Sequence, residues 1–178
     1  MNTPWFIDIE ASALDGYPVQ IAYGCSVDQI KSFIIEPFPE WVEDADRWSE
    51  DAFECHGFTP AYLRKHGQPA SHVAAQVSSD LCNKTVYTDA PGYDEHWLGL
   101  LFSAVTRDTG ETFSMPTFKS INFDLLPGRT WQWMARREGW QDRMEKLGKR
   151  VHHADVDVLV HLLCWQSFDS CEPKSVLP

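Results

Sequence analysis

Two carboxylates stand two residues apart in an apolar run near the start of the chain. Asp8 and Glu10 lie in the stretch 5–14, WFIDIEASAL, whose phenylalanine and isoleucines are typical of a buried strand. Side chains of a strand alternate between its two faces, so this spacing puts both acids on one face, close together. Two carboxylates about 5 Å apart repel each other by roughly 3 kcal/mol at an effective dielectric constant near 20. Either a cation or a proton offsets this repulsion, or the acids lie at a strand end and reach solvent or an arginine.

A third carboxylate points inward from a helix that the sequence predicts to begin at Pro91. Asp94 shares an apolar stripe with the residues three, four and seven positions later, which are Trp97, Leu98 and Leu101. Asp89 is the alternative, because it ends the preceding strand, although an aspartate before a helix is typical of a turn or a cap. The sequence favours Asp94 for the inward position and leaves the role of Asp89 open.

Histidines and acids come together again in the segment 151–163, VHHADVDVLVHLL. His152 and His153 precede a strongly apolar helix, and Asp155 and Asp157 occupy its first turns. A first-turn aspartate commonly favours the helix dipole, which is the structural alternative for either acid. An imidazole accepts a proton near neutral pH, so a histidine beside an aspartate can also place a general base next to a metal ligand.

The elements that position these residues are predicted to form an α/β domain, a mixed five-stranded sheet flanked by helices. The strand-like runs are 5–11, 18–24, 31–35, 84–89 and 118–123. Helical periodicity covers 60–66, 70–81, 91–105 and most of 126–168. With 178 residues, 43% of them hydrophobic, the chain suits one domain over residues 1–170, followed by a C-terminal tail at 171–178.

Composition excludes several classes of protein. The odd number of cysteines and the lack of a C-x-x-C pair argue against a disulfide framework and a zinc site, and favour reduced thiols in a cytoplasmic protein. These cysteines are Cys25, Cys55, Cys82, Cys164 and Cys171. We find no signal-like segment and no apolar run near twenty residues, so we expect neither secretion nor a membrane partner. The net charge of −11 argues against broad electrostatic binding of duplex nucleic acid. The basic stretch 119–150 is either a solvated helical face or a contact for an anionic backbone.

In this order, the motifs resemble those of the DEDDh (DnaQ-like) 3′-5′ exonucleases, which include ribonuclease T, oligoribonuclease and polymerase proofreading subunits. The matching positions are Asp8 and Glu10 in DIE, then Asp94 in YD, then His152 with Asp157 in H-x-x-x-x-D. Each motif is short, but together they cover most of the chain on the expected types of element.

Two further segments support the resemblance. ECHGFT at 54–59 is similar to the family's His-Gly-Ile-Thr segment, and ASAL at 11–14 is similar to the small residues and leucine after its first motif. His152 matches better than His153, because only His152 has the five-residue step to Asp157. Asp89 departs from the pattern, since many members have a different polar residue there.

The resemblance implies a ribonuclease H-like fold and stepwise release of nucleoside monophosphates from single-stranded nucleic acid with a free 3′ end. RNA or short oligonucleotides are favoured over DNA, because an acidic stand-alone domain is more similar to ribonuclease T and oligoribonuclease. The implied substrate contacts are Ala11, Leu14 and Phe58, with Trp48 as a second candidate for stacking on a base. Many members dimerise, so a homodimer is also implied.

The implied chemistry needs cations, because four carboxylates in one pocket cannot all ionise comfortably alone. Oxygen ligands suit two Mg²⁺ or Mn²⁺ ions, held by Asp8, Glu10, Asp94 and Asp157. His152 would accept the proton of the attacking water. The alternatives are a metal-free nucleic-acid binding module on the same fold, and an interaction protein whose motif matches are accidental.

Overall fold

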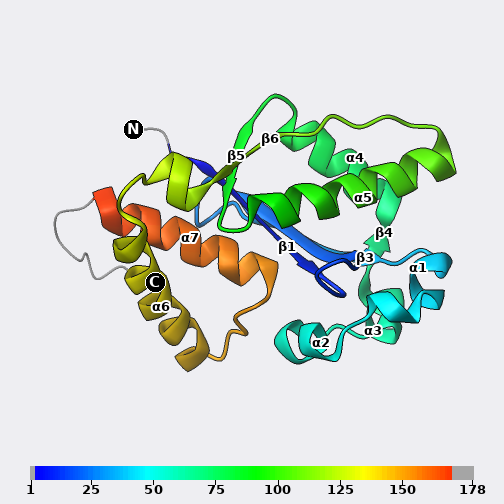
Figure 1. The fold of residues 1–178 in the computed structure, drawn as a ribbon, viewed down its shortest axis with the longest axis horizontal. Helices are drawn as coiled ribbons and strands as arrows, with labels where there is room; N and C mark the ends of the chain where they lie inside the picture. The colour runs from blue at the N-terminus through cyan, green and yellow to red at the C-terminus, as the bar shows by residue number, and fades with distance from the viewer. Residues whose placement is uncertain (1–2, 170–178) are drawn as a thin grey trace.

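The centre of the molecule is a six-stranded mixed sheet with the strand order β4-β3-β2-β1-β5-β6 (Figure 1). The structure is a computed structural model that describes residues 3–169, so the predicted tail at 171–178 lies outside the described residues. β1 pairs antiparallel with β2 and parallel with β5, which in turn pairs parallel with β6. The strands are β1 (Trp5–Ala11), β2 (Pro18–Gly24), β3 (Lys31–Glu36), β4 (Gln68–Pro69), β5 (Thr85–Thr88) and β6 (Thr117–Ser120).

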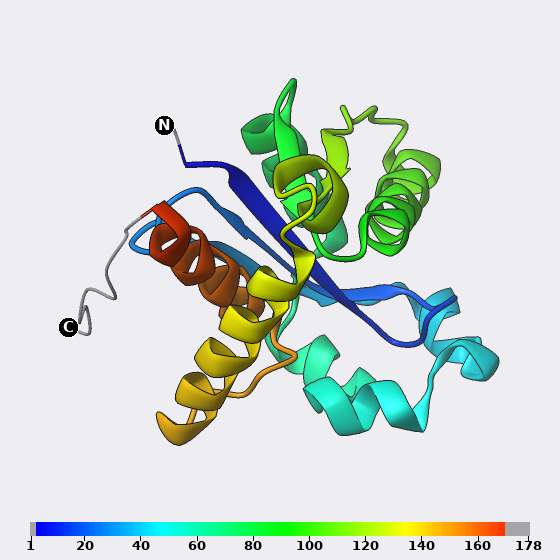
Figure 2. The same ribbon diagram turned by 60° about the vertical axis from the view of Figure 1, so that its left-hand side comes forward.

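Helices cover both faces of this sheet, as two views show (Figures 1 and 2). α4 and α5 lie on one face, whereas α6 and α7 lie on the other. The short helices α1 to α3 gather beside the end of β1 from which its connection to β2 leaves. The helical segments are α1 (Pro39–Glu43), η1 (Ala45–Arg47), α2 (Glu50–His56), α3 (Pro60–His66), α4 (Ala70–Leu81), α5 (Pro91–Thr109), η2 (Ile121–Leu125), α6 (Thr130–Lys146) and α7 (Ala154–Asp169).

The period of two along β1 divides its side chains between two cores. Ile7 and Ile9 pack in the cluster that contains the buried residues of α4 and α5. Phe6 packs in the opposite cluster, with residues of α6 and α7. Because Asp8 and Glu10 share the parity of Phe6, both acids belong to the face that α7 covers.

The predicted fold class is confirmed, with three differences in detail. The sheet has a sixth strand, β4, which is only two residues long and lies at one edge. The strand predicted over 118–123 ends at Ser120, whose side chain accepts a hydrogen bond from the backbone of Phe123 and turns the chain into η2, a π-helical segment. The long C-terminal helical stretch divides into α6 and α7, and Gly148 in the connection has a positive φ of 75°. No helix within residues 3–169 is long and apolar enough to cross a membrane.

Candidate active site

Asp8 and Glu10 lie where the middle of the sheet meets α7. Asp8 pairs with Ala22 and Glu10 with Gln20 in the antiparallel register of β1 and β2. On the other side of β1, the parallel register with β5 pairs Phe6 with Tyr87. Asp8 and Asp89 each lie two residues further along, so the same register brings them level with each other. The sheet therefore places acids from two of its segments at one point.

Asp94 occupies the first turn of α5 and is 2% exposed, as its place in the apolar stripe predicts. The Thr88 hydroxyl at the end of β5 donates a hydrogen bond to its Oδ2. Burial raises the pKa of Asp94 well above its ordinary value, although the bond from Thr88 and a backbone bond from Ile9 oppose this rise. Asp94 also raises the pKa of Asp8 through charge repulsion, so the two acids lie close together.

The start of α7 is fixed to the sheet by one buried side chain of β2. Gln20 donates a hydrogen bond from Nε2 to Oδ1 of Asp155 at 3.0 Å, and its Oε1 accepts one from the backbone of Ala154 at 2.9 Å. Gln20 is 3% exposed, so these bonds replace water that it cannot reach. Asp155 therefore has a structural partner, and Asp157, two residues on, is directed to Asp8 and Glu10.

Asp157 also holds the backbone that carries the histidine pair. Its Oδ2 accepts a hydrogen bond from the backbone N–H of His152 at 3.1 Å. Its Oδ1 is buried and makes no hydrogen bond of good geometry within the described chain, although Gln141 of α6 lies close enough to lower the pKa of Asp157 by hydrogen bonding. His152 has a positive φ of 63°, an uncommon backbone conformation for a residue other than glycine. A buried carboxylate oxygen without a hydrogen bond of good geometry is a ready ligand for a cation.

The two histidines of the pair have different surroundings. His152 is exposed, and after Arg137 it is the next charged neighbour that lowers the pKa of Asp157 against the effect of burial. His153 instead packs its ring against Phe58 at 4.8 Å between centroids and donates from Nε2 to the carbonyl of His56 at 2.9 Å. The side chain of His153 is thus engaged in packing, and that of His152 is accessible.

Three carboxylates converge closely enough to share an ion. One oxygen each from Asp8, Glu10 and Asp157 lies within 4.8 Å of the other two. Burial and the neighbouring acids raise the pKa of Glu10 to about 8 and raise that of Asp8 well above its ordinary value. Burial also raises the pKa of Asp157. Such an oxygen-only set disfavours its own ionisation and fits a hard divalent cation, such as Mg²⁺ or Mn²⁺.

Sequence reasoning left Asp89 open and missed His161 and Arg137. Asp89 forms an ion pair with Arg137 of α6 at 2.9 Å. A ring nitrogen of His161 and oxygens of Asp8 and Asp89 all lie within 4.8 Å of one another. Burial lowers the pKa of His161 to about 4, so this imidazole is neutral at physiological pH. Its only sequence signal is the four-residue step from Asp157 along one helix face.

The predicted substrate contacts Ala11 and Leu14 lie at the end of β1 and in the loop that follows it. Leu14 is 69% exposed at the tip of the loop, whereas Ala11 is buried. The Ser12 hydroxyl donates to the carbonyl of Arg47 at 2.6 Å, and the Arg47 guanidinium donates to the carbonyl of Asp15 at 3.0 Å. These bonds fasten the loop to η1 from both sides and hold Leu14 outward.

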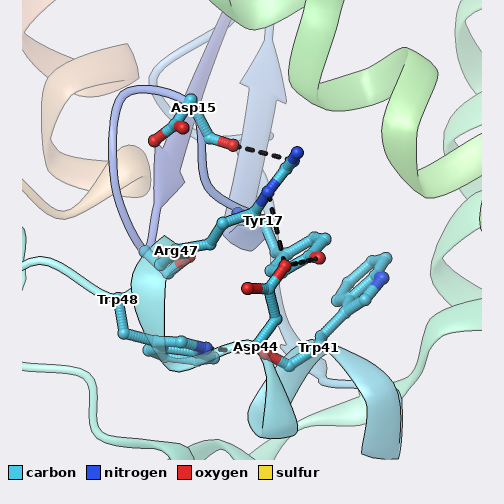
Figure 3. A network of polar contacts seen from close by, with 7 residues as sticks. Asp15, Tyr17, Trp41, Asp44, Arg47 and Trp48 are labelled. Carbon is cyan, nitrogen blue, oxygen red and sulfur yellow. Dashed lines mark hydrogen bonds and ion pairs between the residues drawn. The ribbon is translucent and has the colours of Figure 1, made fainter.

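The base of this loop is continued by a polar and aromatic network (Figure 3). The Tyr17 hydroxyl donates to Asp44 at 2.8 Å, and the Tyr17 ring stacks on Trp41 at 4.8 Å between centroids. Trp48 donates its indole N–H to the carbonyl of Trp41 at 2.7 Å. Trp48 is therefore engaged in the network that supports the loop, with its polar atom already bonded.

His56 and Phe58 support the loop from below. His56 donates from Nε2 to the carbonyl of Ala11 at 3.1 Å, and its Nδ1 accepts from the backbone of Phe58 at 3.0 Å. Phe58 is 4% exposed and packs against the rings of His56, Tyr62 and His153. Phe58 thus offers little surface to a base, while the adjacent Tyr62 is 42% exposed.

The segment before α7 caps the end of α2. Arg150 donates to the carbonyls of Glu54 and Cys55 at 2.9 and 3.0 Å, and His153 donates to the carbonyl of His56. Gly57 follows with a positive φ of 77°, and a Cβ there would lie 2.2 Å from the Arg150 guanidinium. The predicted similarity of 54–59 to a His-Gly motif thus corresponds to a contact with the histidine pair.

Comparison with known proteins identifies the fold. The sequence matches no protein-family model and no curated protein. The structure is similar to E. coli exonuclease I in complex with a dT13 oligonucleotide, with a TM-score of 0.62 and 16% identity over 98% of this chain and 42% of that chain. The zinc-bound form of the E. coli exonuclease I complex with single-stranded DNA gives a TM-score of 0.60 and 15% identity over 96% of this chain and 41% of that chain.

A second exonuclease is similar over most of its own length. Exonuclease X in complex with 5′ overhanging duplex DNA gives a TM-score of 0.57 and 18% identity over 92% of this chain and 89% of that chain. The present chain thus spans about two fifths of exonuclease I (42%) and nearly all of exonuclease X. These likenesses establish a shared fold and confirm the ribonuclease H-like architecture predicted from the sequence.

Proposed function

We propose that this protein is a metal-dependent 3′-5′ exonuclease of the DEDDh type, which releases nucleoside monophosphates from single-stranded nucleic acid with a free 3′ end. The observation that carries the proposal is the convergence of Asp8, Glu10 and Asp157 beside the exposed His152. Repulsion among acids is costly unless cations are bound, and a fold alone does not require it. The shared fold with exonucleases I and X supports the proposal.

The residues divide into ligands and a base. Asp8, Glu10 and Asp157 would hold a divalent ion, and Asp94, which is buried against Thr88 in the same pocket, completes the set proposed for two Mg²⁺ or Mn²⁺ ions. Bound divalent ions would stabilise charge on the scissile phosphate and acidify the attacking water. His152 would serve as the base for the attacking water, because its imidazole is accessible while its backbone is fixed by Asp157.

The substrate is proposed to reach this pocket past the loop after β1. Leu14 is exposed at the tip of that loop and is proposed to pack against terminal bases, with Ala11 and Phe58 supporting the same side. Stacking and apolar contacts of this kind tolerate any base sequence. The solved neighbours include complexes with single-stranded DNA. The preference for RNA or short oligonucleotides stays a prediction, and so does the homodimer.

The test is hydrolysis of a 5′-labelled single strand by the full chain, as RNA and as DNA, with Mn²⁺, with Mg²⁺ and with chelator. We expect a ladder shortened from the 3′ end, which a 3′ block and the chelator both abolish. Asp157→Asn should abolish it too, whereas the exposed Asp108→Asn on α5 should not. Hydrolysis in chelator, or protection by a 5′ block, would contradict the assignment. Binding of the strand without hydrolysis in either metal would instead support the metal-free binding module.

A further inference from the structure

His161 of α7 is a buried imidazole without a hydrogen-bond partner. Its exposed fraction is 0%, and neither ring nitrogen has a partner among the described residues. The ring packs beside Phe6 and Trp133, 5.8 Å from each between centroids, and these two rings are 6.1 Å apart. A neutral imidazole offers one donor and one acceptor, and leaving a buried polar atom unsatisfied costs about 1–3 kcal/mol. An apolar side chain would fill this place without that cost, so the imidazole needs another explanation.

At least one ring nitrogen of His161 lies close to carboxylates. Oxygens of Asp8 and Asp89 lie within 4.8 Å of one of these nitrogens and of each other. The three residues come from separate elements, β1, the end of β5 and α7, which the core holds in place on all sides. The spacing suits an ion placed between the three ligand atoms.

We propose that Asp8, Asp89 and His161 form a second ion position, which takes a divalent first-row transition-metal ion in preference to Mg²⁺. Imidazole nitrogen is a ligand for such ions, whereas Mg²⁺ prefers oxygen ligands and water. The inference deepens the proposed function and rests on it in one respect, because Asp8 also belongs to the oxygen-only set with Glu10 and Asp157. Because Asp8 is shared, the two ion positions are neighbours. An ion at the position of Asp8, Asp89 and His161, called the inner ion below, would give the His161 ring nitrogen a partner.

Arg137 is the charged group that opposes an ion at this position. Its guanidinium pairs with Oδ2 of Asp89 at 2.9 Å, so Asp89 can bind an ion through Oδ1 while it keeps the arginine. A second cation nearby weakens ion binding, and removal of the guanidinium should strengthen it. We therefore expect Arg137→Gln to bind the inner ion more tightly than the parent does, by about tenfold for a relief of about 1.4 kcal/mol.

Metal stoichiometry tests the second position without reference to nuclease activity. Native mass spectrometry and calorimetric titration of the metal-free full chain with Mn²⁺ should show one ion at His161 in addition to the ions held by the oxygen-only set. His161→Leu should bind one ion fewer than the parent, because leucine packs beside Phe6 and Trp133 without a ligand atom. His72→Leu, which changes an exposed histidine of α4, is the control and should bind as many ions as the parent. Equal numbers of bound Mn²⁺ ions in His161→Leu and the parent would overturn the proposal.

A measurement on the unmodified chain guards against a variant that fails to fold. In imidazole ¹H–¹⁵N spectra of the parent, the His161 resonances should shift when diamagnetic Zn²⁺ is added and stay in place with Mg²⁺, whereas those of His56, the other buried histidine, should not respond. His161 resonances that Zn²⁺ leaves unshifted would overturn the second position, whatever the variants do. Glu10→Gln should lose the oxygen-only ion and keep this Zn²⁺ response. These measurements can therefore show that no ion binds at His161 in a chain that is an active exonuclease. They can equally show that an ion binds there in a chain without exonuclease activity.

Discussion

Glu10→Gln should remove the part of the pH dependence of stability that Glu10 contributes in the metal-free protein. The pKa of Glu10 rises from 4.5 to about 8 on folding, because burial and the acids around it, first of all Asp157, disfavour its charged form. Between these two pH values the folded chain holds a proton on Glu10 that the unfolded chain has lost. The contribution of Glu10 to the free energy of unfolding is therefore fully present below pH 4.5 and is lost as the pH rises to about 8.

The size of this effect follows from the change in pKa. One pKa unit corresponds to 1.36 kcal/mol, so the rise from 4.5 to about 8 has an upper bound of about 5 kcal/mol. Glu10 retains partial contact with solvent, and screening there reduces the effect to about 1–3 kcal/mol. Glutamine has the shape of glutamate and does not ionise, so the variant lacks this contribution.

The assay is urea unfolding in chelator at pH 5.5 and pH 8.5. The stability of Glu10→Gln relative to the parent should improve by about 1–3 kcal/mol between the two pH values, which is about 2–4 °C in Tm for each kcal/mol. Glu36→Gln, which changes an exposed glutamate of β3, should show no such difference. Mn²⁺ at pH 8.5 should stabilise the parent more than Glu10→Gln. If the free energies of unfolding of Glu10→Gln and the parent differ by the same amount at both pH values, the raised pKa of Glu10 is refuted.

The other predictions concern the histidine pair and the loop. His152→Asn keeps a residue that tolerates the left-handed backbone but removes the base, so kcat should fall by about 10²- to 10⁴-fold while Mn²⁺ binding by calorimetry is unchanged. His153→Ala loses its contact with Phe58 and a hydrogen bond, so it should unfold about 1–2 kcal/mol more easily in urea and keep most activity; the opposite pattern of activity would move the third motif by one residue. Leu14→Ala should raise KM for a single strand with little change in melting temperature, since the side chain is exposed.

The inward acids of β1 and α5 could be predicted from the sequence because they depend on local periodicity. A spacing of two in a strand puts Asp8 and Glu10 on one face, and the helical stripe accounts for the burial of Asp94. Both signals are complete within a few residues. The structure places these acids on the faces that the sequence predicts. Their roles as metal ligands stay predictions, which metal-binding measurements must test.

His161 and Asp89 could not be placed in this way, because their neighbourhood depends on long-range pairing. His161 stands in an apolar helical run, where a histidine reads as one more core residue. Asp89 reaches Asp8 only through the parallel register of β1 and β5, which pairs residues about eighty positions apart. The break between α6 and α7 had a local signal in Gly148, but the surrounding residues are good helix formers and hid it.

The cap on α2 has a consequence for the dynamics of the chain. The carbonyls at the end of this helix accept their bonds from Arg150 and His153, which lie more than ninety positions later. The end of α2 is therefore protected only while the segment before α7 is in place. Local opening of one should expose the amides of both, so hydrogen exchange would find a single cooperative unit here. In that unit, His152 and the His56 support of the β1 loop would become ordered or disordered together.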